Sequence, residues 1–393
     1  MKMYQTILQV SHAAILVLVA KLMLLLVIAS VGSSAWAQMP EGFTKLATGD
    51  LAPDFDLPGV DDKNHKLADF SAAKVLVVVF TCNHCPTAQA YEARLNQLLA
   101  DYADKGLAMV AISPNDPQAV RLDELGYSDL GDLLDDMKVR AKQAGFKFPY
   151  LYDGENQKVS LSYGAMATPH VFIFDEARKL RYHGRIDDSE SGQAIESADA
   201  QNAIDAILAG KKVAVEKTRV FGCSTKWISK RQSAKDSIKR WSKEPVELTV
   251  ASKEDIKTLA ANATDKYRLI NVWATWCAPC VEELPELVTI NRMYRGRKFE
   301  MITISTDSAA DKEKALKVLT DKQCSSKNLL FDSEKRDDLF DNLDGQSEGG
   351  VPYTVLIAPG GEVVHRQHSS IDAVELRRII VDRIGRTYAA NKK

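Results

Sequence analysis

Residues 273–280 constrain the fold more than any other part of the chain, because they read W-A-T-W-C-A-P-C. Two cysteines separated by two residues follow the apolar run 269–272 directly and precede an amphipathic run at 281–294. This order predicts a buried strand that ends just before the cysteines and a helix that begins at them. We therefore expect an α/β fold with a pair of thiols at a strand-to-helix junction.

The position of Cys277 and Cys280 favours redox chemistry. A thiolate on the first turn of a helix faces unpaired N–H groups and the positive end of the helix dipole, and both lower the thiol pKa. Cys277 is therefore the predicted nucleophile, and Cys280 the predicted resolving thiol. The alternatives are a structural disulfide and half of a zinc site. A structural pair rarely lies beside two tryptophans such as Trp273 and Trp276, and zinc needs further ligands that Cys324 and the distant histidines do not supply.

Together with the following Glu283, these residues resemble the thioredoxin superfamily, in particular its extracytoplasmic TlpA/ResA branch, over about residues 246–388. The resemblance implies that Val351 and Pro352 form the family's cis-proline loop against the dithiol. A cis bond there would direct the Val351 backbone at a substrate chain, which would add as a short strand. Asn271 replaces the buried acid of thioredoxin, so Glu283 becomes the candidate for proton transfer.

The N-terminal segment has the pattern of a signal peptide. Residues 13–31 are almost wholly apolar apart from Lys21, and Ala35 and Ala37 form the small-x-small pattern of a signal-peptidase site. We predict a signal peptide over 1–37, cleaved after Ala37. The alternative is an uncleaved anchor, in which Lys21 would cost about 2.5–3.5 kcal/mol at the bilayer centre. Export would place the chain in the periplasm or cell envelope, an oxidising compartment.

The length of 393 residues suits two domains. We expect a first domain over 41–225, a basic linker over 226–245 and a second domain over 246–393. The linker is predicted to be a solvated, helical or irregular segment, and the alternative is attraction to anionic lipid or to an acidic partner. The 51 Lys and Arg residues nearly balance the 53 Asp and Glu residues, so nothing in the charge argues for nucleic acid as a partner.

A second C-x-x-C motif lies at Cys82 and Cys85. A β-branched run at 74–80 precedes it, a helical pattern follows it, and an apolar strand is predicted at 107–113. The same order of strand, C-x-x-C, helix and strand recurs at 269–305. We therefore predict two thioredoxin-like domains, each an α/β unit with a mixed β-sheet flanked by helices.

The first of these units resembles the redoxin, or AhpC/TSA-like, proteins that carry a C-N-H-C-P site. The resemblance implies that Cys82 attacks, that Cys85 resolves, and that Thr168 and Pro169 shape the docking surface for a substrate. It also raises thiol peroxidase activity as an alternative. Peroxiredoxins place the reactive cysteine three residues after a threonine, whereas a threonine directly precedes Cys82, so the peroxidase interpretation fits poorly.

His84 stands one position before the second cysteine of that site. An imidazolium there would stabilise the thiolate of the reduced form and make this couple the more oxidising of the two. The alternative is a solvent-facing loop residue. A different class of function is a copper or zinc protein, in which Cys82, His84, Cys85 and His170 bind the metal and the second domain keeps them reduced.

Cys223 and Cys324 lie outside both motifs. They are free thiols, resolving cysteines or one disulfide that joins the domains. The favoured function is an exported oxidoreductase that reduces or exchanges disulfides in cell-envelope proteins through both C-x-x-C pairs. Its partners would be protein dithiols and disulfides, and the TlpA/ResA resemblance implies an electron donor in the membrane. No cofactor is expected, because the reducing equivalents arrive as thiols.

Overall fold

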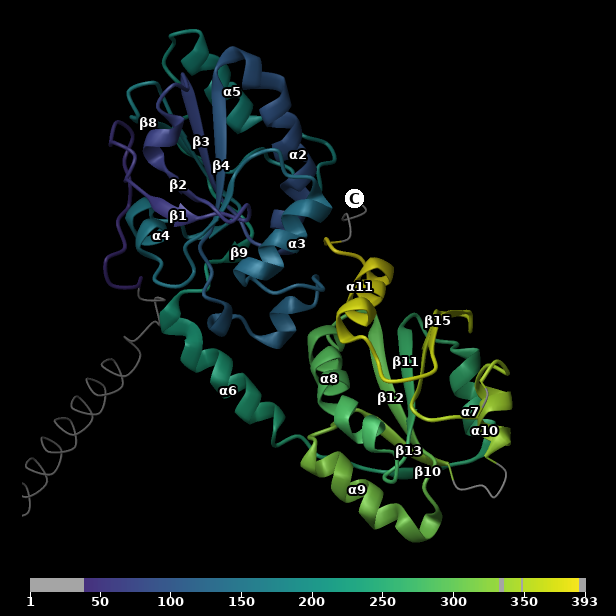
Figure 1. Cartoon of the computed structure of the whole chain (residues 1–393). Coiled ribbons are helices and arrows are strands. Elements are labelled where there is room, and N and C mark those ends of the chain that lie inside the picture. Colours follow the sequence, from purple (N-terminus) through teal and green to yellow (C-terminus); the bar gives the residue numbers. More distant parts are fainter. Residues whose placement is uncertain (1–38, 332–335, 348, 389–393) are drawn as a thin grey trace, which may run out of the picture. The chain divides into compact units, whose positions relative to one another are not determined.

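The structure, a computed structural model, describes residues 39–331, 336–347 and 349–388 (Figure 1). The predicted signal peptide, 1–37, lies outside the described residues. Every helix and strand described belongs to the compact unit of residues 42–393. Within the described ranges, no helix has both the length and the apolar character needed to cross a bilayer.

The first module is built on a five-stranded mixed sheet in the order β5-β4-β3-β7-β8. Its strands are β3 (Val75–Phe80), β4 (Leu107–Ser113), β5 (Tyr150–Tyr152), β7 (His170–Phe174) and β8 (Leu180–Gly184). The central strand β3 runs parallel to β4 and antiparallel to β7. All six of its residues are buried, which confirms the buried strand that the β-branched run predicts.

Helices cover both faces of this sheet (Figure 1). They are α2 (Pro86–Tyr102), α3 (Leu134–Ala144), α4 (Lys158–Tyr163) and α5 (Asp199–Leu208). On one face, Val77 of β3 shares a buried cluster with Tyr91 of α2 and Ile204 of α5. Its neighbour Val78 points to the other face and shares a cluster with Tyr163 of α4. Successive residues of a strand alternate between faces, so a strand covered on both sides must be apolar throughout.

Two short ladders complete the first module: β1 (Asp56–Pro58) pairs with β2 (Asn64–Lys66), and β6 (Ala167–Thr168) pairs with β9 (Cys223–Ser224). Both ladders are antiparallel. The β6-β9 ladder joins the loop before Pro169 to a segment more than 50 residues further along the chain.

The second module repeats the plan with a six-stranded mixed sheet in the order β10-β13-β12-β11-β14-β15. Its strands are β10 (Thr249–Ala251), β11 (Tyr267–Trp273), β12 (Phe299–Ser305), β13 (Lys327–Phe331), β14 (Tyr353–Ile357) and β15 (Val363–Gln367). Its helices are α7 (Lys253–Ala261), α8 (Ala278–Tyr294), α9 (Lys312–Asp321), α10 (Asp337–Leu343) and α11 (Ala373–Ile384). The central strand β11 is parallel to β12 and antiparallel to β14, as β3 is to β4 and β7. The predicted duplication of a mixed sheet flanked by helices is confirmed.

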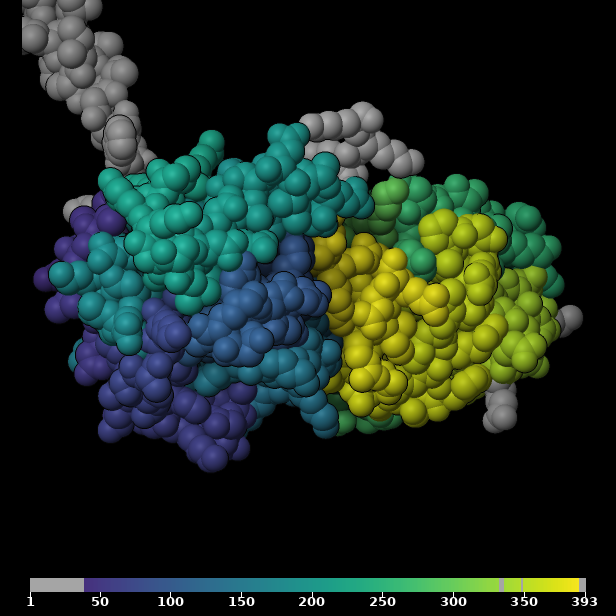
Figure 2. Space-filling model, turned by 90° about the horizontal axis from the view of Figure 1, so that it is seen from above, coloured from purple at the N-terminus to yellow at the C-terminus, as the bar shows by residue number. Residues whose placement is uncertain are grey.

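The segment predicted as a linker is helical, because α6 (Arg231–Trp241) occupies most of it. Arg231 at its start forms an ion pair with Asp116, with 2.5 Å between Nε and Oδ2. At the C-terminal end, α11, which belongs to the yellow part of the chain in Figure 2, buries Leu376 and exposes Val374. This one-sided burial is typical of an amphipathic helix that covers one face of a sheet.

Candidate active sites

Two cis peptide bonds mark the loops that the sequence analysis assigned to substrate docking. They are Thr168-Pro169 and Val351-Pro352. The first precedes β7 and the second precedes β14, the strand that occupies the same place in each sheet. The cis bond expected at Pro352 is confirmed, and Pro169 matches it.

In the second module, Cys277 is the N-cap residue of α8 and forms a disulfide with Cys280. Cys277 is 6% exposed and Cys280 is fully buried, so the sulfur nearer the helix start is the more accessible one, as predicted. Val351 packs against the buried cluster that contains both cysteines. The loop before the pair is held by Asp307, whose carboxylate accepts hydrogen bonds from the backbone N–H and the hydroxyl of Thr275.

Glu283 lies buried on the first turns of α8. Its carboxylate accepts hydrogen bonds from Asn271 Nδ2 at 2.9 Å and from the backbone N–H of Ile371 at 2.9 Å. Burial outweighs these bonds and raises the pKa of the carboxyl. Asn271, which stands where thioredoxin has its buried acid, therefore holds the Glu283 carboxylate in place. Trp276, by contrast, is 56% exposed beside the cysteines and lies under the guanidinium of Arg336.

In the first module the helix begins after the whole motif, whereas in the second module it begins between the two cysteines. Cys85 is the N-cap residue and Pro86 is the first residue of α2. Proline is favoured at the first helical position, and the residue before a proline is pushed out of the α region, which fits the extended φ of −75° and ψ of 120° at Cys85. Cys82 therefore precedes the helix and is 2% exposed, while Cys85 is fully buried.

The two sulfurs of this site contact the loop before the cis bond. Cys82 Sγ lies 3.1 Å from Thr168 Oγ1, and Cys85 Sγ lies 3.2 Å from the Thr168 carbonyl oxygen, to which its thiol form donates. The cysteines and the Thr-Pro loop, which are separated by more than 80 residues, thus form one site.

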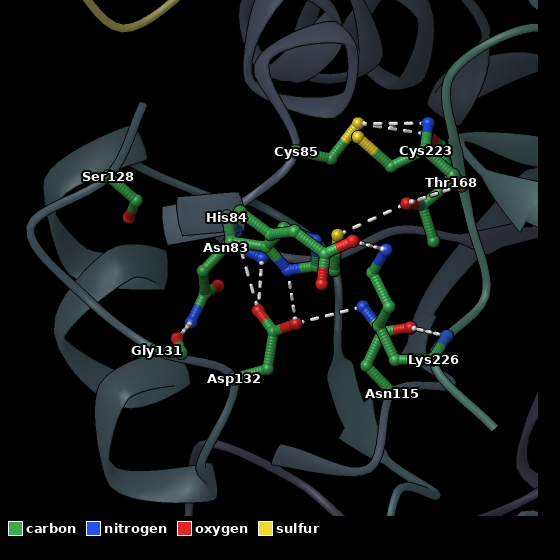
Figure 3. Close-up of polar contacts among 12 residues, drawn as sticks. Asn83, His84, Cys85, Asn115, Ser128, Gly131, Asp132, Thr168, Cys223 and Lys226 are labelled. Carbon is green, nitrogen blue, oxygen red and sulfur yellow. Dashed lines mark hydrogen bonds and ion pairs between the residues drawn. The ribbon is translucent and has the colours of Figure 1, made fainter. Parts of the chain in front are cut away.

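The alternative that His84 is solvent-facing is wrong, because its ring is buried against Asp132 (Figure 3). His84 Nδ1 lies 2.6 Å from Asp132 Oδ2. The same carboxylate accepts hydrogen bonds from the backbone N–H of Asn83 and from Asn115 Nδ2. Burial alone would lower the pKa of His84, but the charge and hydrogen bond of Asp132 outweigh it and raise that pKa. The raised pKa favours the positively charged form of His84 beside the sulfurs, paired with the Asp132 carboxylate.

The thiolate of the first site is favoured on Cys85 rather than on Cys82. Burial opposes ionisation of Cys85, but hydrogen bonds from the Cys223 and Cys82 thiols, and then the charge of His84, outweigh it and place its pKa well below the usual range. Burial and the hydrogen bond to Cys85 raise the pKa of Cys82 well above its usual value. This order of pKa values differs from the expectation that Cys82 attacks, because the hydrogen-bond donors and the charge of His84 stabilise the Cys85 thiolate.

Of two further residues of this site, the sequence analysis missed Asp132 and named Cys223 only as a possible resolving cysteine. Asp132 lies 48 positions from His84 in an acidic stretch, and nothing local distinguishes it from the other acids there. Cys223 donates its backbone N–H to Cys85 Sγ at 3.3 Å and is free. Cys324 is also free and is buried beside Asn328, so the disulfide proposed between Cys223 and Cys324 is wrong.

The residues that lie close enough to share a metal ion differ from the predicted ligands. Ligand atoms of Cys82, His84 and Asp132 lie within 4.8 Å of one another, and His84 Nε2 is buried without a hydrogen-bond partner. His170, which the sequence analysis included, instead has its Nε2 3.4 Å from Nδ1 of His183. This group offers one thiolate and one imidazole, donors that suit soft metals, together with the Asp132 carboxylate.

Comparisons with known proteins agree with this architecture. The model of the AhpC/TSA family matches residues 48–183 and 243–366. Thiol-disulfide oxidoreductase ResA of Geobacillus thermodenitrificans is 24% identical over 160 residues, which are 40% of this chain and 80% of that protein. A putative peroxiredoxin of Mycobacterium tuberculosis is 40% identical over 77 residues, which are 19% of this chain and 48% of that protein. A solved hypothetical protein of Sinorhizobium meliloti is 36% identical, covers 47% of this chain and 97% of its own, and has a TM-score of 0.42.

Proposed function

The chain belongs to the AhpC/TSA family and is a thiol-disulfide oxidoreductase, and from this premise we propose that it acts through two separate C-x-x-C centres on proteins of the cell envelope. One observation carries the proposal. In each module a cysteine pair lies at the junction of the central strand and the next helix, and each module has a cis X-Pro bond before the neighbouring strand. A disulfide and a dithiol interconvert at such a junction by attack of a thiolate on a disulfide sulfur.

At the second centre, reduced Cys277 attacks a substrate disulfide and forms a mixed disulfide. Cys280 then attacks Cys277 Sγ, releases the substrate thiol and leaves the Cys277–Cys280 disulfide that the structure contains. We propose that Glu283, whose pKa is raised by burial, takes the proton of the second thiol, and that the substrate chain adds along the Val351 backbone. The reducing equivalents that reset the centre come from a dithiol donor in the membrane.

At the first centre, Cys82 and Cys85 form the corresponding couple. Cys85 is its stabilised thiolate, since the His84 charge and several hydrogen-bond donors surround it. A stabilised reduced form makes a couple more oxidising, so this centre has the higher potential of the two.

Export of the chain is supported by the small-x-small pattern at Ala35 and Ala37. Identification of the N-terminal residue of protein recovered from a periplasmic fraction tests it.

Insulin reduction by the purified chain tests the two-centre function. Cys277→Ser and Cys85→Ser should each remove one part of the rate, and the double variant should fall to the rate of the dithiol reductant alone. Cys324→Ser is the matched control, because this buried cysteine contacts neither centre. If the double variant keeps the rate of the unmodified chain, the proposal is wrong.

A second candidate function is soft-metal binding at the first centre, favoured by the unpartnered His84 Nε2 beside Cys82. Metal analysis of natively purified protein distinguishes the two functions. One equivalent of copper or zinc that is lost in His84→Gln but retained in the Cys277→Ser variant favours the metal protein.

A further inference from the structure

The edge beside the first cis bond is already occupied by the chain itself. β9 pairs antiparallel with β6, so Thr168 lies opposite Cys223 and Ala167 lies opposite Ser224. This is the edge on which a substrate strand would add. In the second module, no strand of the described ranges pairs with Val351. We call β9 the built-in strand of the first centre, because it occupies the edge that is open in the second centre.

The segment around β9 is fastened to the site on both sides of Cys223. Gly222 has a φ of +127°, and a Cβ atom there would lie 2.2 Å from the Thr168 carbonyl oxygen, so only glycine permits this approach. Thr225 donates its backbone N–H to the carbonyl oxygen of Met166 and its hydroxyl to that of Ala165. Lys226 donates its backbone N–H to Asn115 Oδ1 at 2.8 Å.

Asn115 connects this segment to the rest of the centre. Its Nδ2 donates to the same Asp132 carboxylate that holds His84 (Figure 3). The backbone after Cys223 and the His84 ring thus share one buried hydrogen-bond network, so the position of Cys223 is set by the same groups that build the dithiol site. Hydrogen bonds shared in this way restrain the positions of the groups that they join.

Cys223 meets Cys85 directly. Its backbone N–H donates to Cys85 Sγ at 3.3 Å, and the two side chains point toward one another (Figure 3). Cys223 packs on the buried cluster of Cys82, Cys85 and Ala88. It is only half-buried, whereas Cys82 and Cys85 are 2% and 0% exposed. Of these three cysteines, Cys223 is therefore the most exposed residue.

We propose that Cys223 is the third redox cysteine of the first centre, and that Cys85 exchanges its disulfide between Cys82 inside and Cys223 at the surface. The β9 strand holds Cys223 where the cysteine of a docked substrate would lie. Protein thiols and disulfides then react at Cys223 rather than at the buried pair. This inference rests on the proposed redox function and adds the sulfur through which the first centre meets its partner.

The exchange is balanced within the chain. Cys223 loses its proton to solvent and attacks Cys85 Sγ; the Cys82–Cys85 bond breaks, and the Cys82 sulfur leaves with the electron pair and takes up a proton. One disulfide replaces another, with no net oxidation. A substrate thiolate then attacks Cys223 Sγ, and Cys85 leaves as a thiolate stabilised by the helix start and the Cys223 N–H. The second thiol of the substrate attacks the mixed disulfide, so the substrate loses two electrons and Cys85 and Cys223 gain them. Every step is reversible.

Peptide mapping tests the new disulfide, because trypsin places its two cysteines in different peptides. Cys82 and Cys85 fall in residues 75–94, and Cys223 falls in residues 220–226. The full chain carrying Cys277→Ser, Cys280→Ser and Cys82→Ser is oxidised with glutathione disulfide, alkylated and digested. We expect the 75–94 peptide to be linked to the 220–226 peptide in most molecules. Glutathione adducts on both cysteines without this link would overturn the proposal.

Activity measurements distinguish a failure of this inference from a failure of the proposed function on which it rests. With the second centre silenced by Cys277→Ser and Cys280→Ser, Cys223→Ser should lower the rate of thiol-disulfide exchange with a protein substrate about tenfold or more, while the Cys82–Cys85 disulfide still forms. Cys223→Ala and the circular dichroism of both variants check that the fold is intact, and Cys324→Ser should keep the full rate. If Cys85→Ser loses activity but Cys223→Ser keeps it, the inference fails and the proposed function stands. If Cys85→Ser also keeps the full rate in this background, the proposed function of the first centre fails.

Discussion

Replacement of Asp132 by asparagine tests the electrostatic design of the first centre. The carboxylate accepts hydrogen bonds from Asn83 N–H at 2.9 Å, His84 Nδ1 at 2.6 Å and Asn115 Nδ2 at 2.8 Å, and both members of its pair with His84 are buried. Asparagine keeps the shape, but it removes the charge and turns one acceptor into a donor. Deleting one partner of a buried ion pair costs about 3–5 kcal/mol of unfolding free energy.

The cost should depend on pH in a specific way. The pKa of Asp132 is lowered, despite burial, by the charge and hydrogen bond of His84, so its contribution to stability is present above the unfolded value of 3.8 and lost as pH falls. The pKa of His84 is raised, so its contribution is complete below 6.5 and lost as pH rises through the folded pKa. The difference between wild type and Asp132→Asn should therefore be largest at about pH 4–6.5 and shrink to about 1–2 kcal/mol at alkaline pH, where only hydrogen bonds are lost.

Urea unfolding of the reduced chain, followed by circular dichroism across this pH range, measures the difference. Thiolate absorbance in the ultraviolet gives a second readout, because a neutral His84 should raise the pKa of Cys85. Glu92→Gln is the matched control, since Glu92 also forms a buried ion pair, with Arg140, and touches no sulfur. A difference below about 1 kcal/mol at pH 5, or one that stays constant to pH 9, would refute the reasoning.

Three further predictions concern the second centre, the built-in strand and the histidines. Glu283→Gln should lower the rate of insulin reduction by about 10- to 100-fold, as expected for loss of a proton-transfer group, while Glu282→Gln at the exposed neighbouring position should not. Gly222→Ala should lower the unfolding free energy by about 2 kcal/mol or more because its Cβ meets Thr168, whereas Gly210→Ala, which meets no atom, should cost about 1 kcal/mol from its positive φ alone; chemical denaturation compares them. Burial lowers the pKa of His170 to about 3, so the unfolded chain binds a proton more readily below pH 6.5 and wild type loses stability as pH falls. His170→Phe should flatten this loss between about pH 6.5 and 4, and an unchanged slope would contradict the assignment.

The fold was predictable from two local patterns. The apolar runs before each C-x-x-C have the residues of a fully covered strand, and β3 and β11 are such strands. The Val-Pro dipeptide predicted the cis bond at Pro352 through the resemblance that the neighbouring motifs carry, whereas the cis bond at Pro169 was not predicted. The helix after the first motif was also predictable, and it begins at Pro86 because proline is favoured at the first helical position.

The sequence by itself determined which chemistry this protein can perform, because cysteine spacing and the strand-to-helix order are local properties of the chain. Only the tertiary structure decided which groups surround each sulfur. Asp132 reaches His84 across 48 positions, and Cys223 reaches Cys85 across 138. Such partners are selected by the sheet register and by the β6-β9 ladder, and no local pattern separates them from the other acids and thiols. Sulfur reactivity depends on charges and hydrogen-bond donors within a few ångströms, so the tertiary contacts decide which cysteine holds the thiolate.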